Sequence, residues 1–261
     1  MSPTTTDGWS PEVYARFSQH RTAPFDDLLA LLTPRPGGSA LDLGCGTGVL
    51  THKAHAALQV ATTLGLDSSA AMLGAEGPKA PGLSFEQRDV ARDLPARTFD
   101  RVISNSAFNW VDDHAAFLPR VLALVAPGGE LAFQVPSNPR SPFSECALEV
   151  AAQFGDELQG YRYLSPVQSC DFYAELLARH PRVVRSRVGT WRYPQLHASV
   201  DGLVAFAQGG LLTAYRSRLS PERFEAFCAA YARALRARYG DGPVFFAFRR
   251  VFVFAKLTAP A

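Results

Sequence analysis

The chain has 261 residues, of which 47% are hydrophobic and 19% charged, a composition typical of a globular protein with a sizeable core. Its net charge of +2 is too small to favour a nucleic-acid partner, and its longest apolar run, residues 244–255, is interrupted by two arginines and is too short to span a membrane. The four cysteines are scattered without a Cys-x-x-Cys pair. They therefore predict neither a metal site nor a disulfide framework, and they favour a cytoplasmic location.

One or two helices are expected before the first strand. Residues 10–12 (Ser-Pro-Glu) form a typical helix start, with serine as the N-cap and proline at the first helical position. This helix is expected to end at Arg21 and Pro24, and a second, apolar helix is expected over 25–32. Residues 1–38 are therefore interpreted as N-terminal helices that precede a sheet.

Short apolar runs then alternate with segments of helical spacing as far as residue 136. The expected strands are 40–43, 61–67, 83–89, 99–105 and 130–135, and the expected helices are 49–58, 69–75 and 115–125. This alternation predicts an α/β fold with a parallel sheet and helices on both of its faces. We expect residues 39–136 to form the ligand-binding core of a single domain.

The alternation stops after residue 136. Helices are expected over 143–154, 171–179, 200–216 and 221–239, with a long strand over 182–193 and a final strand over 250–257. Residues 167–196 and 243–258 would complete the sheet. Because ligands bind at the carboxyl ends of the strands in an open parallel sheet, we predict that the mostly helical insertions 137–166 and 197–240 form a cap over the site. Peripheral decoration is the alternative.

The strongest motif is Leu-Asp-Leu-Gly-Cys-Gly-Thr-Gly at residues 41–48, where three alternate glycines separate the first strand from a helix. Glycine has no Cβ, so the backbone can turn tightly and a ligand can lie against it. The following helix start leaves free N–H groups at the same place. The spacing is not the Gly-x-Gly-x-x-Gly of dinucleotide folds, and no Gly-Lys-Ser/Thr follows, so no phosphate loop is predicted. A plain tight turn is the alternative.

Three acidic residues lie within or at the ends of the first three expected strands. Asp67 ends the expected second strand, near the offset of about 20 residues at which a carboxylate binds ribose hydroxyls. Asp89 ends the third, where it can accept a hydrogen bond from an adenine amine. Asp42 lies inside the first strand and, once buried, needs a partner such as a ligand ammonium or the N–H groups of the glycine turn. Each acid alone could be a helix cap or a surface residue, but together they indicate a ligand with a ribose and an adenine.

These residues resemble the class I S-adenosylmethionine-dependent methyltransferases. The motifs that carry the resemblance are the glycine loop, Gly-Leu-Asp-Ser-Ser at 65–69, Arg-Asp at 88–89, Phe-Asp-x-Val-Ile-Ser-Asn at 99–105 followed by Trp110, and Pro-Gly-Gly at 127–129. Over nearly the full length the chain also resembles the trans-aconitate methyltransferase family. The further matches are Trp-x-Pro-x-x-Tyr-x-x-Phe at 9–17 with Arg21 and Pro24, Phe-Tyr-x-x-Leu at 172–176, and Ala-Phe-x-Arg-x-Phe at 247–252.

The resemblance implies a Rossmann-like sheet of seven strands, mostly parallel, with the last strand antiparallel. It also implies S-adenosylmethionine as cofactor, S-adenosylhomocysteine as product, and methyl transfer to a carboxylate of a small polycarboxylic acid. No nucleic acid, membrane or metal is expected as a partner. The chain departs from the family at 155–165 and at Arg249, where a proline is expected, and both regions are expected near the substrate.

The candidate cofactor-binding residues are Asp42, Gly44, Cys45, Gly46, Asp67, Ser68, Met72, Asp89, Val90, Asn105 and Trp110. The candidate substrate-binding residues are Tyr14, Arg21, Trp110, Arg249 and Arg250. Arginine suits this role because its planar guanidinium binds a carboxylate through two parallel hydrogen bonds. Adjacent strand residues face opposite sides, so at most one of the last two faces the substrate, and the resemblance favours Arg250.

No catalytic residue is assigned, because the expected chemistry needs mainly in-line positioning. The sulfonium methyl is already activated, and a carboxylate nucleophile is ionised at neutral pH without a general base.

Three alternatives stay open. A malonyl-carrier-protein methyltransferase would need a docking surface for an acidic carrier protein, which arginines on the cap could provide. A secondary-metabolite O- or N-methyltransferase could use the aromatic residues of the cap to line a hydrophobic pocket. A non-catalytic cofactor-binding module is also compatible with the sequence, because class I methyl transfer has no universal catalytic residue.

Overall fold

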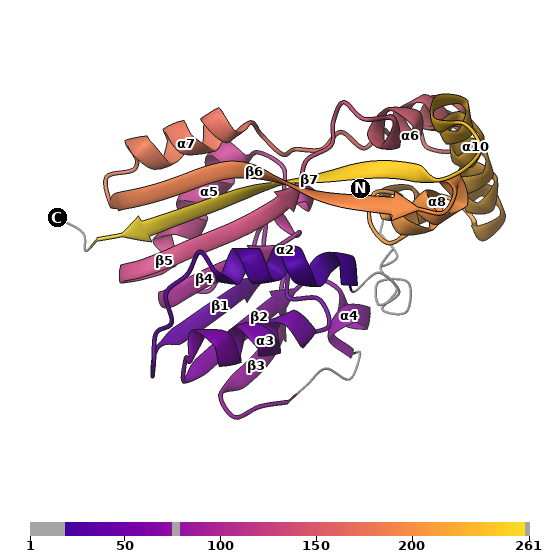
Figure 1. The fold of residues 1–261 in the computed structure, drawn as a ribbon. Coiled ribbons are helices and arrows are strands. Elements are labelled where there is room, and N and C mark those ends of the chain that lie inside the picture. Colours follow the sequence, from indigo (N-terminus) through magenta and orange to yellow (C-terminus); the bar gives the residue numbers. More distant parts are fainter. Residues whose placement is uncertain (1–18, 75–78, 259–261) are drawn as a thin grey trace. The chain divides into compact units, whose positions relative to one another are not determined.

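The computed structural model describes residues 19–74 and 79–258, and its central feature is a seven-stranded sheet in the order β3-β2-β1-β4-β5-β7-β6 (Figure 1). The strands are β1 (Ser39–Leu43), β2 (Thr62–Asp67), β3 (Leu83–Gln87), β4 (Phe99–Asn105), β5 (Val125–Pro136), β6 (Val183–His197) and β7 (Val244–Leu257). β1 to β5 pair in parallel, and β7 is antiparallel to β5. The predicted Rossmann-like class, with its antiparallel last strand, is confirmed.

The chain divides into two compact units, which we call the sheet unit (19–137, 166–191 and 249–258) and the helical unit (138–165 and 192–248). The sheet unit contains the helices α2 (Gln19–Leu29), α3 (Val49–Leu58), α4 (Ala70–Gly74), η1 (Phe108–Trp110), α5 (His114–Ala123) and α7 (Cys170–Arg179). The helical unit contains α6 (Pro142–Gln153), α8 (Val200–Gln208), α9 (Thr213–Arg216) and α10 (Pro221–Tyr239). Among the described residues, no helix is both long and apolar enough to cross a membrane.

Helices lie on both faces of the sheet, as the strand–helix alternation predicts. One apolar layer joins the buried side chains of β1 and β4 to those of α5 and α7, including Phe117 and Leu177. Within the same unit, the α7 residue Tyr173 donates its hydroxyl to His114 Nδ1 at 2.7 Å, and His114 Nε2 lies 2.9 Å from the carbonyl of Phe108. These contacts link α7, α5 and η1, the short helix that follows β4.

The helical unit is organised around α10, whose predicted bounds match the structure. Ser220 caps its start by accepting from the Arg223 N–H at 3.3 Å, and Gly240 ends it at a φ of 76°. The buried ring of Tyr231 donates its hydroxyl to the Phe143 carbonyl at 2.6 Å, which ties α10 to α6. The unit includes most of both predicted insertions. That these insertions cap the ligand site stays a prediction.

The expected break between two N-terminal helices at Arg21 and Pro24 is wrong. α2 continues through Pro24, although proline lacks an N–H and disfavours a helix interior. The next residues explain this, because Phe25 and Leu28 are fully buried and their packing outweighs the local cost.

Several strand and helix bounds also differ from the predicted ones. β7 begins at Val244 instead of residue 250, so Arg249 and Arg250 lie within the strand and not at its start. β3 ends at Gln87, so Asp89 lies two residues beyond it. β5 begins at Val125, ahead of an irregular pairing with β4. The expected helix 200–216 is divided into α8 and α9, because the intervening Gly209 ends α8.

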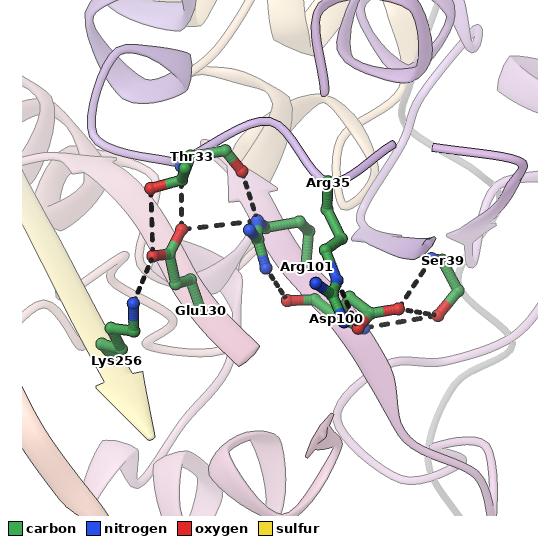
Figure 2. A network of polar contacts seen from close by, with 7 residues as sticks. All are labelled: Thr33, Arg35, Ser39, Asp100, Arg101, Glu130 and Lys256. Atoms are coloured by element: carbon green, nitrogen blue, oxygen red, sulfur yellow. Dashed lines mark hydrogen bonds and ion pairs between the residues drawn. The ribbon is translucent and has the colours of Figure 1, made fainter. Parts of the chain in front are cut away.

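The edge at which β4 begins carries a network of paired charges (Figure 2). Arg101 and Glu130 form an ion pair at 3.3 Å, with side chains only 5% and 3% exposed. The N–H of Thr33 donates to Glu130 at 2.8 Å, and the Thr33 carbonyl accepts from Arg101 at 2.6 Å. Buried charges persist only when they are paired and hydrogen-bonded in this way. This network therefore fixes the segment before β1 at the edge opposite the carboxyl ends of the parallel strands.

Candidate functional site

The glycine loop between β1 and α3 is held in a conformation that requires glycine. Gly44, Gly46 and Gly48 have φ values of 81°, 58° and 78°, in the left-handed region. The N–H of Gly44 donates to the carbonyl of Leu66 in β2 at 2.7 Å. A Cβ on Gly44 would lie 2.1 Å from the Cβ of Ala107, which follows β4. The loop therefore packs directly against the segment after β4, at the carboxyl ends of three neighbouring strands.

Asp67, at the end of β2, joins this loop to α4. Its Oδ2 accepts from the Gly46 N–H at 2.8 Å, and its Oδ1 accepts from the Ser69 N–H at 2.9 Å. Next to it, Ser68 is exposed, and Ser69 Oγ accepts from the N–H of Met72 at 3.0 Å. A carboxylate can accept about four hydrogen bonds. Asp67 can therefore hold the loop and accept from a ligand hydroxyl at the same time.

Asp42 is 3% exposed and lies in β1, two residues before Gly44, the first glycine of the loop. Its Oδ2 accepts from Thr51 Oγ1 at 2.6 Å, whereas Oδ1 is buried and has no hydrogen-bond partner in the described part of the chain. The partner expected from the sequence was a ligand ammonium or a glycine-loop N–H. The structure supplies a hydroxyl from α3, a contact that strand spacing alone does not reveal.

Burial raises the pKa of Asp42 from 3.8 to about 7, although the hydrogen bond from Thr51 lowers it. The native state therefore binds the carboxyl proton of Asp42 more tightly than the unfolded chain does. The stability that Asp42 contributes is fully present below about pH 4 and is lost as the pH rises through 7.

We predict that Asp42→Asn, which cannot ionise, removes this pH dependence. The unfolding free energy of the variant minus that of the wild type should increase by on the order of 3 kcal/mol between about pH 4 and 7, and level off above that range. Urea denaturation across this range measures the difference. Thr51→Val should extend the loss of unfolding free energy to higher pH, because it removes the hydrogen bond that lowers the pKa of Asp42. Parallel curves for wild type and Asp42→Asn would contradict the assignment.

Cys45 and Met72 complete the apolar surroundings of the loop. The Met72 side chain is 3% exposed, and its Cε lies 3.3 Å from the position a Cβ on Gly46 would take. The Cys45 thiol is buried 3.8 Å from the Gly46 carbonyl, and burial raises its pKa far above the ordinary value. Cys45 is therefore a packed, protonated thiol and not a nucleophile.

The turn after β3 contains Asp89 and Val90 and is anchored from α5. Asp89 Oδ1 accepts from the Ala91 N–H at 3.0 Å. Arg120 donates to the carbonyls of Ala91 and Arg92 at 2.7 and 3.1 Å, which fixes the turn from outside. Asp89 is exposed, while Val90 packs against the apolar core. Sequence reasoning missed Arg120, because an arginine on an amphipathic helix gives no signal of its long-range partner.

Hydrogen bonds hold the segment that follows Asn105 and contains Trp110. Ser106 has a φ of 61°, uncommon for a residue other than glycine, and its N–H donates to the Gln134 carbonyl at 2.9 Å. Asn109, oriented to satisfy both neighbours, donates to the Ser106 carbonyl and accepts from Trp110 Nε1, each at 2.9 Å. The indole of Trp110 is therefore fixed in place by the residue beside it.

The two arginines of β7 lie on opposite faces, as expected for neighbours in a strand. Arg250 is 3% exposed, and its Nη1 donates to Ser106 Oγ at 2.7 Å and to Gln134 Oε1 at 2.8 Å. Arg249 is half-buried, and its carbonyl accepts from the Ser137 N–H at 2.9 Å. Sequence reasoning missed the partners Ser106 and Gln134.

The side chains of two expected substrate ligands, Tyr14 and Arg21, are not among those that the structure describes. Tyr14 lies outside the described residues. Arg21 belongs to α2, but only its backbone is described. The structure therefore groups the glycine loop with Asp67, Asn105 and Trp110 at the carboxyl ends of β1, β2 and β4.

Comparisons with known proteins agree with this geometry. A family model described as "Methyltransferase domain" matches residues 14–194. Among solved structures, phosphoethanolamine N-methyltransferase 2 of Haemonchus contortus, in complex with phosphomonomethylethanolamine and S-adenosylhomocysteine, has a TM-score of 0.55 at 14% identity. The match covers 91% of this chain and 53% of that one, and it shows the fold alone. Fold, loop and family model together define a methyltransferase domain.

Relatives that match over nearly the whole chain identify the family more precisely. A trans-aconitate 2-methyltransferase of Deinococcus radiodurans is 37% identical over 254 residues, which cover 95% of this chain and 97% of that protein. A second, from Methylobacterium radiotolerans, is 35% identical and covers 95% of this chain and 98% of its own. The chain therefore belongs to the class I S-adenosylmethionine-dependent methyltransferases, in the family of the trans-aconitate 2-methyltransferases.

Proposed function

We propose that this protein transfers a methyl group from S-adenosylmethionine to a carboxylate of a small polycarboxylic acid of the trans-aconitate type, forming a methyl ester. The observation that carries the proposal is the similarity to trans-aconitate 2-methyltransferases at 37% and 35% identity, because it covers 95% of the chain and thus reaches both units.

The residues around the glycine loop fit the cofactor. Gly44 and Gly46 hold positive φ angles and carry no side chain, so a ligand can lie against the loop backbone. Asp67 would accept from the ribose hydroxyls, Asp89 would accept from the adenine amine, and Asn105 and Trp110 would lie by the methionine end. When bound, S-adenosylmethionine supplies a methyl group activated by the sulfonium charge. The chain's own contribution is to position the two reactants in line.

A carboxylate acceptor agrees with the titratable groups near this edge. Burial lowers the pKa of His114, and both of its ring nitrogens are hydrogen-bonded, to Tyr173 and to the Phe108 carbonyl. The Cys45 thiol stays protonated. Neither group is therefore proposed as a base, and a carboxylate needs none at neutral pH. We propose Arg21, Arg249, Tyr14 and Trp110 as substrate contacts, with the arginines binding the spare carboxylates.

We predict a base-labile methyl ester when the purified protein is incubated with methyl-labelled S-adenosylmethionine and trans-aconitate. Cis-aconitate, citrate, a malonyl carrier protein and a phenol complete the panel. At saturating cofactor, the rate of the chemical step should be nearly independent of pH from about 6.5 to about 8.5, because carboxylates titrate near 4. The Asp42→Asn variant controls for the titration of Asp42 within this range.

Three results separate the alternatives. A product that survives mild alkali, or a steep rise of the chemical step with pH, would assign the reaction to a hydroxyl or amine acceptor. Methylation of the malonyl carrier protein without methylation of any free acid would favour the carrier-protein reaction. Cofactor binding without transfer to any member of the panel would favour a non-catalytic module.

A further inference from the structure

A buried polar relay connects β7 to the residue that ends β4. Gln134 in β5 is fully buried, and its Oε1 accepts from Arg250 Nη1 at 2.8 Å. Gln134 Nε2 donates to Ser106 Oγ at 2.9 Å and to Asn105 Oδ1. Ser106 Oγ also accepts from Arg250 Nη1 at 2.7 Å. Three strand residues, Asn105, Gln134 and Arg250, thus share one hydrogen-bond network with Ser106 at the carboxyl end of β4.

The strand register explains how these distant residues meet. Gln134 lies opposite Asn105 in the parallel β4–β5 pair. In the antiparallel β5–β7 pair, Gln134 lies opposite Phe252 and Pro136 lies opposite Arg250. Gln134 and Arg250 are therefore diagonal neighbours on one face of the sheet, within reach of long side chains.

The donor and acceptor capacities fix the direction of every bond in the relay. A guanidinium has only donors, so the atom of Gln134 that faces Arg250 must be its oxygen. Its amide nitrogen then faces Asn105, which must present its own oxygen. The Nδ2 donors of Asn105 are consequently directed away from the relay.

The backbone conformation of Ser106 is a second observation that supports a functional role for this network. Ser106 holds a φ of 61°, and non-glycine residues in the left-handed region persist only where the surroundings determine them. Here the surroundings are Arg250 and Gln134, which both donate to its hydroxyl. The relay thus holds the backbone at Ser106 and the amide of Asn105 together.

We propose that Arg250 and Gln134 are positioning residues that hold the Asn105 amide with its donors outward, so that this position binds a carboxylate oxygen. The inference rests on the proposed function, and it assigns Arg250 a role through Gln134 instead of direct contact with the substrate. The carboxylate has two sources, the methionine portion of the cofactor or the acid that receives the methyl group.

The test uses Gln134→Glu, which reverses the direction of the hydrogen bond between residue 134 and Asn105. A glutamate at this position accepts from Arg250 as glutamine does and forms an ion pair with it. It must also accept from Asn105, so the Asn105 amide turns over and presents its oxygen outward. Gln134→Met is the matched control, because it removes the relay without inverting it. The wild type, both variants and Asn105→Asp are compared.

The first readout needs no ligand. In ¹⁵N-labelled protein, the side-chain amide of Asn105 is identified by its absence from the Asn105→Asp spectrum. In Gln134→Glu, one of its protons should move downfield and exchange more slowly, because it donates to a buried carboxylate. An unchanged Asn105 amide signal in Gln134→Glu would overturn the inference, whatever the protein methylates.

The second readout identifies the source of the carboxylate. Gln134→Glu should weaken carboxylate binding about tenfold or more, and Gln134→Met should weaken it less. A loss in calorimetric affinity for S-adenosylhomocysteine assigns the cofactor, whereas unchanged affinity with a raised KM for the acid assigns the substrate. Arg250→Lys, which keeps a donor to Gln134, should retain more binding than Arg250→Met. If the wild type binds S-adenosylhomocysteine and Gln134→Glu alters neither quantity, the inference fails while the proposed function stands.

Discussion

Replacing Asp67 by alanine is expected to reduce the affinity for S-adenosylhomocysteine by about a hundredfold or more. The carboxylate accepts from the N–H groups of Gly46 and Ser69 at 2.8 and 2.9 Å, so it holds the glycine loop in its binding conformation. It is also the proposed acceptor for the ribose hydroxyls. Hydrogen bonds to a charged group contribute about 1.5–3 kcal/mol each, so the loss of two or more gives an effect of this size. Isothermal titration calorimetry with S-adenosylhomocysteine measures it.

Two further variants separate the effect of Asp67 from general damage. Asp67→Asn keeps one oxygen acceptor and should lose less affinity than Asp67→Ala. Asp93→Ala removes an exposed carboxylate that pairs with Arg88 at 3.4 Å, and its affinity should match that of the wild type. If Asp67→Ala binds S-adenosylhomocysteine within about twofold of the wild type, Asp67 does not carry the ribose.

The sequence was sufficient to predict the core of this fold, because its signals are local. The glycine loop and the run of β2 up to Asp67 depend on contacts within a few tens of residues, and β1 pairs directly with β2. Asp42 appeared as an acid within an apolar strand, and it is buried there. Its actual partner, Thr51, lies on the next helix, where the first strand and loop alone do not specify which side chain faces the strand.

The parts that sequence reasoning missed depend on long-range register. Arg250 and Gln134 are 116 residues apart, and they meet only because β7 inserts between β5 and β6 in the opposite direction. Arg120 anchors the turn that contains Asp89 from α5, 29 residues along the chain from its partner Ala91, and the strand pattern gives no signal of that contact. The break expected at Pro24 failed for a related reason, since the burial of Phe25 and Leu28 against other elements overrides a local preference.

Gly44→Ala is expected to lower the unfolding free energy by about 2–5 kcal/mol and to abolish measurable cofactor binding. Two costs combine at this residue. Its φ of 81° strains any side-chain-bearing residue by about 1–2 kcal/mol, and the new Cβ would lie 2.1 Å from the Cβ of Ala107. Overpacking of this kind costs about 1–3 kcal/mol. Urea denaturation gives the stability, and calorimetry with S-adenosylhomocysteine gives the binding.

The structure offers variants that isolate each cost. Gly128 has a φ of 73° with open space around it, so Gly128→Ala should show the backbone cost alone. Adding Ala107→Gly to Gly44→Ala removes the overlapping methyl group and should recover the packing part of the loss, leaving a deficit close to that of Gly128→Ala. A Gly44→Ala variant no less stable than Gly128→Ala would show that the loop can move away from Ala107. The close contact between the glycine loop and the segment after β4 would then not be needed to form the site.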